Sequence, residues 1–244
     1  MNFKHAAAVC ALVSGLTLST PALAAPGLGD EVYAATVEKG EPEFEARYGR
    51  LGGGPDDGED VIKFEAGYGV TDRLRVAVLG EFEREPGDRR RAEAMGIEAV
   101  YALGKLGGVD VALYGEYELG FNGNSDAVET KLLLQRRTGP WDLRLNLIAE
   151  KPLVSGAPVE LGYAASVDTA VLGETRLGVQ AYGALGTFSH FAPREEHFIG
   201  PVAKFEIEGL GVDELGLQVG YLFALGKARD DTKGQFKVNL ELEF

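Results

Sequence analysis

The residues of this chain that could carry chemistry are charged side chains that alternate with apolar ones. Between 109 and 121, acids such as Asp110 and Glu116 occupy even positions, whereas apolar residues such as Val111 and Leu113 occupy odd ones. Because successive side chains of a strand point to opposite faces, this pattern predicts a strand with one polar and one apolar face. Carboxylates that share such a face attract cations through their summed field.

The same alternation recurs along most of the chain and predicts twelve strands. These cover 43–51, 61–70, 74–84, 92–103, 109–121, 128–137, 141–151, 159–168, 176–186, 197–207, 214–225 and 235–244. The segment 92–103 is ambiguous, because its apolar residues also fit helical spacing. We assign it as a strand because its neighbours are strands and because Gly96 would weaken a helix.

The connections between these strands are of two kinds. Short turns are expected around Asp72, Gly107, Gly139, Gly173 and Gly211, and they alternate with mostly longer polar loops. An even number of strands with short turns on one side is the layout of outer-membrane barrels. Strands of about 9–12 residues can cross a hydrocarbon core when tilted by about 45°. Since backbone groups in lipid must all be paired, we expect a closed all-β barrel, antiparallel and up-and-down, of about 12 strands.

The N-terminus has the features of an export signal. Lys4 precedes an apolar stretch over 6–18, and Ala22-Leu23-Ala24 forms a small-x-small cleavage site. We therefore expect 1–24 to be a cleaved secretory signal peptide, with cleavage after Ala24. Residues 25–42 are expected to be an N-terminal lead-in and 43–244 the barrel. Whether 31–40 forms an extra strand or a periplasmic lead-in stays open.

The last strand carries a recognisable pattern. Its apolar residues alternate up to the final position of the sequence: Phe236, Val238, Leu240, Leu242 and Phe244. This pattern resembles the assembly signal of Gram-negative outer-membrane β-barrel proteins. The resemblance extends over the chain after the signal peptide, but it identifies a class and no specific family. It implies a bacterial outer-membrane location, contact with outer-membrane lipid and insertion by the barrel-assembly machinery. The alternative is a soluble periplasmic barrel whose apolar face points inward, which would not need a terminal aromatic residue.

If the apolar face meets lipid, the alternate residues line the lumen. The candidate pore-lining residues are Glu65, Glu81, Glu98, Asp110, Glu116, Glu129, Asp142, Arg75, Lys131, Arg144, Arg176 and Lys204. Acids outnumber bases on this face, and twelve strands lie between filled eight-stranded barrels and open 16–18-stranded porins. Glycines at lumen positions, such as Gly67 and Gly69, favour an open passage, although glycine also occurs where strands bend.

These features predict a narrow porin-like channel for passive diffusion of small, preferably cationic solutes. The alternative is a closed structural or interaction barrel, in which opposite charges pair across the lumen and the loops face outward. A lipid-active outer-membrane enzyme is the third hypothesis. Its only candidate residues are Ser189 and His190, whose side chains point to opposite sides of an extended chain.

Composition narrows the remaining function classes. The formal net charge of −14 argues against nucleic-acid binding. A single Cys excludes a disulfide scaffold, and we expect no cofactor and no enzymatic activity. His190, His197 and Glu196 could ligate a metal at the barrel mouth, but the spacing is a weak signal and we assign no metal site.

Overall fold

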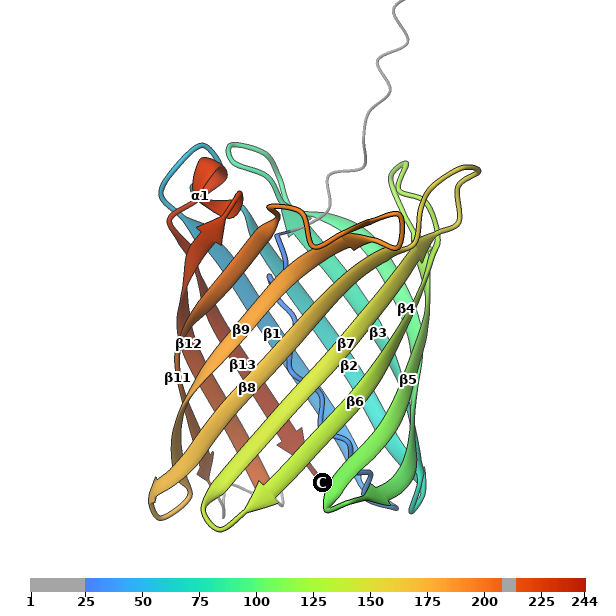
Figure 1. Ribbon diagram of the computed structural model, residues 1–244, viewed down its shortest axis with the longest axis vertical. Coiled ribbons are helices and arrows are strands. Elements are labelled where there is room, and N and C mark those ends of the chain that lie inside the picture. The colour runs from blue at the N-terminus through green and yellow to red at the C-terminus, as the bar shows by residue number, and fades with distance from the viewer. Residues whose placement is uncertain (1–24, 208–213) are drawn as a thin grey trace, which may run out of the picture.

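The computed structural model describes residues 25–207 and 214–244, and these form a closed antiparallel β-barrel (Figure 1). The strands are β1 (Pro42–Gly52), β2 (Asp60–Thr71), β3 (Leu74–Arg84), β4 (Arg91–Leu106), β5 (Val109–Gly120), β6 (Ala127–Thr138), β7 (Trp141–Pro152), β8 (Glu160–Leu172), β9 (Thr175–Thr187), β10 (His190–Phe191), β11 (Glu196–Ile207), β12 (Glu214–Gly226) and β13 (Gly234–Glu243). One helical turn, α1 (Ala228–Asp231), precedes β13. The predicted twelve-stranded barrel is confirmed, and the ambiguous segment 92–103 is a strand.

The barrel closes where its first and last strands pair. β1 lies antiparallel to β13, with Glu45 opposite Glu241 and Tyr48 opposite Val238. Every other wall strand pairs with its neighbours along the chain, and β9 pairs directly with β11. The two-residue strand β10 pairs only with the end of β9, so it is an addition outside the wall. The alternation in the sequence predicts no strand between 186 and 197, so β10 is a feature that this pattern does not indicate.

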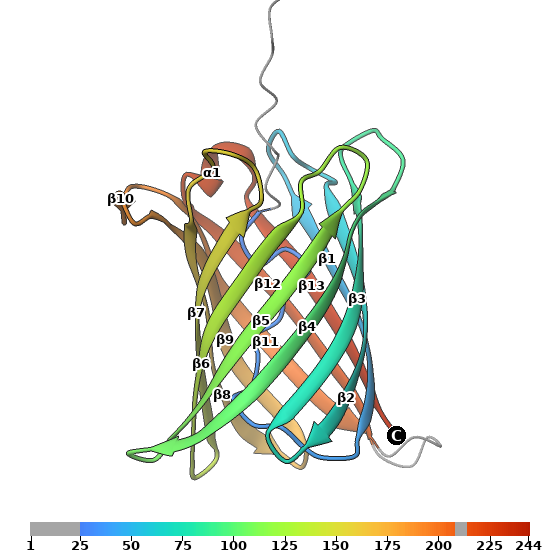
Figure 2. The same ribbon diagram turned by 90° about the vertical axis from the view of Figure 1, so that its right-hand side faces the viewer.

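The two ends of the barrel differ, as Figures 1 and 2 show. The short-turn end carries the tight connections, in which Gly107, Gly139 and Gly173 have positive φ angles of 59°, 56° and 53°. Side chains with a Cβ rarely adopt this conformation, so glycine is required there. The long-loop end carries the larger connections and α1. The turn expected at Gly211 lies outside the described residues.

The two faces of the wall have opposite character. The outer face is apolar, with residues such as Val78, Ile97 and Leu113 exposed, whereas inner residues such as Glu65 and Glu98 are buried. A continuous apolar outer surface is the surface that lipid covers in outer-membrane barrels. Within the described residues, no helix has the length and apolar character needed to cross a membrane.

Residues 25–41, here called the luminal segment, run through the interior of the barrel. Both ribbon views place this segment inside the wall, from the long-loop end to the short-turn end, where β1 begins (Figures 1 and 2). It contains no strand, so 31–40 does not extend the sheet. Its residues Leu28, Val32, Tyr33 and Ala35 are buried.

The luminal segment packs on apolar residues of the inner wall. Leu28 and Val32 belong to one buried cluster and Tyr33 and Ala35 to another. The wall residues of the first cluster are Leu51, Val61, Ala164, Tyr182, Phe198, Leu222 and Ala224. Those of the second cluster are Val100, Ala112, Tyr114 and Leu133. The barrel therefore has a small core inside a largely polar lumen.

If the outer face meets lipid, a charged residue placed on it should destabilise the barrel by an amount that depends on its depth in the membrane. Replacing Ile97, which is 59% exposed on the outer face of β4, with Lys should reduce the free energy of unfolding by about 2–4 kcal/mol. The matched control is Leu106→Lys beside the short turn, where the cost should be about 0–1 kcal/mol. Urea titration in lipid vesicles measures both, and equal costs would contradict a lipid-facing outer surface.

Candidate functional site in the barrel lumen

Two wall side chains hold the luminal segment by its backbone. Asn146 on β7 accepts a hydrogen bond from the Tyr33 amide (2.8 Å) and donates one to the Tyr33 carbonyl (3.1 Å). Gln135 on β6 accepts one from the Ala35 amide (3.0 Å). Buried backbone groups need such partners, and these amide side chains replace the neighbouring strand that the segment lacks. The segment is therefore a bonded part of the interior.

Inner-wall glycines make room for this segment. A Cβ at Gly49 would lie 2.5 Å from the Gly29 amide nitrogen, and one at Gly69 would collide with the Glu38 carbonyl oxygen. A Cβ at Gly67 would instead meet the Arg75 guanidinium. The expectation that Gly67 and Gly69 mark an open passage was therefore wrong, because chain or side-chain atoms fill the space beside them.

An ion-pair network crosses the middle of the lumen. Arg75 donates from Nε to Glu43 and from Nη1 to Glu98, both at 2.9 Å, and it also pairs with Glu65. Arg47 pairs with Glu65 and lies 3.4 Å from Glu45. We call these six charged residues the central network.

The luminal segment is joined to the central network through Tyr33. The Tyr33 hydroxyl donates to Glu98 at 3.0 Å and accepts from Arg47 at 3.3 Å. Tyr114 donates to the same Glu98 carboxylate at 2.8 Å. Segment and network together lie in the middle of the barrel, and Glu31 of the segment lines a cavity toward each end.

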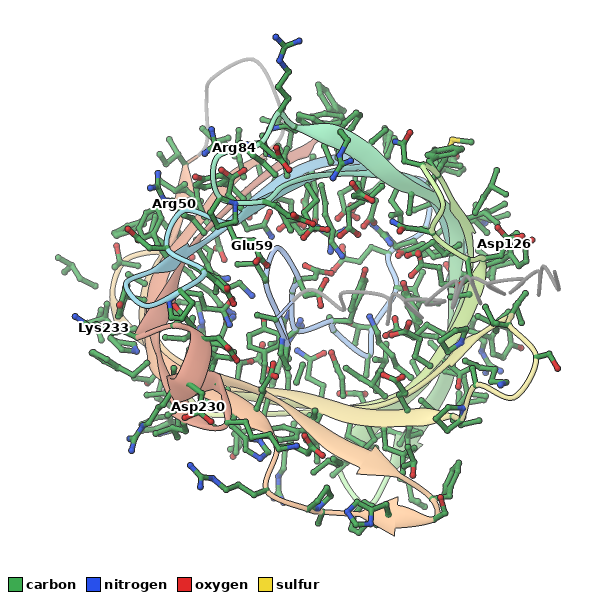
Figure 3. The ribbon with its side chains drawn as sticks, turned by 90° about the horizontal axis from the view of Figure 1, so that it is seen from above. Arg50, Glu59, Arg84, Asp126, Asp230 and Lys233 are labelled. Carbon is green, nitrogen blue, oxygen red and sulfur yellow. The ribbon has the colours of Figure 1, made fainter. Side chains whose placement is uncertain are left out.

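A cavity of about 640 Å³ opens at the long-loop end and is strongly acidic. Its described acidic residues are Asp30, Glu31, Glu81, Glu83, Glu93, Glu116, Glu118, Glu129, Glu150, Glu160, Glu195 and Glu196. Its described basic residues are Arg47, Lys63 and Lys131. Figure 3 looks into this end of the barrel, with side chains filling the interior around the luminal segment. Twelve acids against three bases make this the most one-sided charge distribution described in the lumen.

Part of this acidity is a row of carboxylates on five adjacent strands, β4 to β8. Glu98 is opposite Glu116, Glu116 opposite Glu129, Glu129 opposite Glu150, and Glu150 opposite Glu160. We call this row the carboxylate ladder. Like charges directly opposite one another destabilise a sheet.

Only the carboxylates toward the Glu98 end of the ladder have partners that compensate their negative charge. The Tyr114 hydroxyl donates to Glu116 at 2.6 Å, and Lys131 pairs with Glu129 at 2.8 Å. Among the described residues, the side chains of Glu150 and Glu160 make no hydrogen bond or ion pair. The negative charge at the far end of the ladder therefore has no direct compensating partner among the described residues.

The cavity at the short-turn end is smaller, about 430 Å³, and nearly balanced in charge. Asp168 pairs with Arg176 at 2.5 Å and with Lys204 at 2.7 Å. Asp142 pairs with Arg144 at 3.1 Å. These pairs neutralise one another, so the two ends of the lumen present different electrostatic environments.

The predicted pore-lining residues all face the interior, but they do not form one site. Glu65, Arg75 and Glu98 lie in the central network. The residues of the long-loop cavity are Glu81, Glu116, Glu129 and Lys131, and those of the short-turn cavity are Asp142, Arg144, Arg176 and Lys204. Asp110 pairs with Lys105 near a short turn, at 3.4 Å. The luminal segment, above all Asp30 and Tyr33, was missed, because it lacks the alternation that identified the strands.

The histidines considered as metal ligands lie apart. His190 is exposed on β10, outside the wall, whereas His197 Nδ1 lies 3.4 Å from the Tyr163 hydroxyl. Glu196 lines the long-loop cavity. The Ser189 hydroxyl lies 3.2 Å from that of Thr187, and within the described residues it makes no hydrogen bond to the His190 ring.

Glu59 adds a titratable group at the long-loop end, in the loop between β1 and β2 (Figure 3). Partial burial raises the pKa of Glu59 to about 7, and the neighbouring carboxylates of Glu83 and Asp56 contribute to the same shift. The mouth of the barrel therefore gains negative charge as the pH rises through neutrality.

Known structures share this architecture at low sequence identity. The KdgM porin is 10% identical, with a TM-score of 0.57 over 83% of this chain and 99% of the porin. The NanC porin is 11% identical, with a TM-score of 0.54 over 82% and 98%. An outer-membrane channel from Pseudomonas putida F1 is 13% identical, with a TM-score of 0.55 over 89% and 98%. No protein-family profile and no curated protein sequence matches the chain.

The chain thus has the fold of Gram-negative outer-membrane β-barrel porins and channels. At these identities the similarity establishes the porin-like barrel alone. What the protein does has to be argued from its own lumen.

Removing Arg75, the cation that three carboxylates of the central network share, should strongly destabilise the barrel. Arg75→Ala leaves the buried carboxylates of Glu65 and Glu98 without this partner and should reduce the free energy of unfolding by about 3–5 kcal/mol. Arg137→Ala is the control, because Arg137 is largely exposed and 3.9 Å from Asp142, and it should cost at most about 1 kcal/mol. Urea titration of both variants tests this, and similar small losses would show that the network contributes little.

Proposed function

We propose that the protein is an outer-membrane channel that admits small cations, with the luminal segment restricting passage at its centre. The observation that carries this proposal is the charge of the long-loop cavity, where the described lining has twelve acids and three bases. A narrow cavity lined by one sign of charge concentrates the opposite ion and repels its own. Cations should therefore enter from the long-loop end far more readily than anions.

The carboxylate ladder supports the same proposal. A row of like charges in direct register lowers the stability of the sheet, and Glu150 and Glu160 receive no compensating partner among the described residues. A mobile cation in the cavity would supply that compensation. The ladder would then provide successive weak sites, as conduction requires.

The luminal segment limits what can pass. It is hydrogen-bonded to Asn146 and Gln135 and joined to the central network through Tyr33. Solutes larger than small ions would need the segment to shift. The same observation favours the second candidate function, a closed barrel with a structural or interaction role.

The proposal includes a location and a route of assembly. We propose that the chain is exported, is cleaved after Ala24, and is inserted into the bacterial outer membrane by the barrel-assembly machinery. The pattern of alternate apolar residues ending at Phe244 would be the signal that this machinery reads. The apolar outer surface supports contact with outer-membrane lipid.

Ion selectivity tests the acidic cavity. Refolded protein in a planar bilayer with a potassium chloride gradient should show small currents whose reversal potential indicates cation preference. Glu150→Lys should reduce that preference severalfold, because it reverses charge inside the cavity. The same change at Asp88, an exposed loop residue, serves as the control and should have a small effect. Anion preference in the unsubstituted protein would contradict the proposal.

Loosening the luminal segment tests its restricting role. Asn146→Ala removes both hydrogen bonds to Tyr33 and should raise the mean conductance or the open time severalfold. Thr130→Ala, on the outer face of β6, is the matched control. Folding is checked by the heat-dependent shift in electrophoretic mobility. If the folded protein and its Asn146→Ala variant are both silent, the channel is excluded and the closed barrel is favoured.

A further inference from the structure

Three carboxylates converge where the barrel closes. Glu43 and Glu45 project from the inner face of β1, and Glu241 projects from β13, directly opposite Glu45. One oxygen of each carboxylate lies within 4.8 Å of the other two. Because these strands are the first and last of the barrel, this cluster bridges the closing seam.

The surrounding charges do not balance these acids. The two arginines of the central network serve Glu43, Glu45, Glu65 and Glu98. The Glu241 side chain makes no hydrogen bond or ion pair among the described residues. Five carboxylates therefore share the two guanidinium groups that contact them, while Arg144 acts on Glu241 only from beyond ion-pair distance. A carboxylate held away from water without a direct partner is costly.

A second observation points to a carboxylate oxygen that is incompletely satisfied. Glu45 is only 2% exposed, and its Oε2 atom has no hydrogen-bond donor among the described residues. The nearest cation is Arg47, whose Nε lies 3.4 Å away without forming a hydrogen bond. The buried Asn239 Oδ1, two residues before Glu241 on the same inner face, also lacks a donor. Buried oxygens are normally satisfied, so the Glu45 oxygen, which has only the 3.4 Å ion pair to Arg47 and no hydrogen bond, points to a further positive partner at this cluster.

The geometry suits a hard divalent cation of the size of calcium. Calcium binds oxygen at about 2.3–2.6 Å, so two oxygens on opposite sides of one ion can lie up to about 5 Å apart. The three carboxylate oxygens satisfy the calcium limit as they stand. Water entering from the short-turn cavity, which Asn239 and Glu241 line, can complete the coordination.

We propose that Glu43, Glu45 and Glu241 bind one calcium ion that links β1 to β13. The ion compensates part of the excess negative charge and adds an ionic connection to the hydrogen bonds of the seam. This proposal is independent of the channel function, because it holds equally for a barrel that does not conduct.

Calorimetric titration with calcium chloride tests the site. The refolded protein, dialysed first against a chelator, should bind one calcium ion per chain with saturation. Glu241→Gln should weaken that binding at least tenfold. The control Glu206→Gln removes the same charge elsewhere in the short-turn cavity and should leave the affinity unchanged.

A second variant separates coordination from general attraction. Glu241→Asp keeps the charge but shortens the side chain, so it should also weaken binding if the carboxylate is a ligand. Calcium should raise the unfolding temperature of the unsubstituted protein by more than it raises that of either Glu241 variant. Absence of saturable binding to the folded protein, or unchanged affinity in Glu241→Asp, overturns the proposal.

Discussion

Pairing of every backbone group in the wall is the constraint on which the rest of this structure depends. An open sheet edge cannot be left in hydrocarbon, so β13 has to meet β1 in register. Closure sets the interior width, and in a twelve-stranded barrel the inner side chains do not fill it by themselves. The remaining space contains the luminal segment, whose backbone is in turn hydrogen-bonded to the wall through Asn146 and Gln135.

Charge is distributed unevenly along this interior. At the short-turn end, pairs such as Asp168 with Lys204 satisfy each other, and in the middle Arg75 joins three carboxylates. At the long-loop end the ladder continues to Glu150 and Glu160 without matching bases. A purely structural interior would gain stability by pairing these acids. In the proposed channel, a cation that enters the cavity would supply the pairing that these acids lack among the described residues.

The strand pattern could be predicted from the sequence because its period is two and one face meets lipid. Neighbouring residues such as Ile97 and Glu98 then differ sharply in polarity. A shift of the strand register by one residue would move every apolar side chain to the inner face and every polar one to the lipid. The luminal segment could not be predicted in this way. Val32, Tyr33 and Ala35 bury their side chains against the inner wall without repeating at any fixed spacing. The inward-facing apolar residues that contact these side chains, such as Leu133, interrupt the polar face of the strands. They were the one sequence signal that an additional segment packs against the inner wall.

The position of the luminal segment also determines which charges can act together. Tyr33 reaches Glu98, which belongs both to the central network and to the carboxylate ladder. A displacement of the segment would remove a hydrogen-bond donor from Glu98 and open the middle of the lumen at the same point. The barrier to passage and the local negative charge are therefore coupled through one carboxylate. In the proposed channel, a solute that moves the segment would meet a more acidic lumen, and this would favour cations at the step that limits passage.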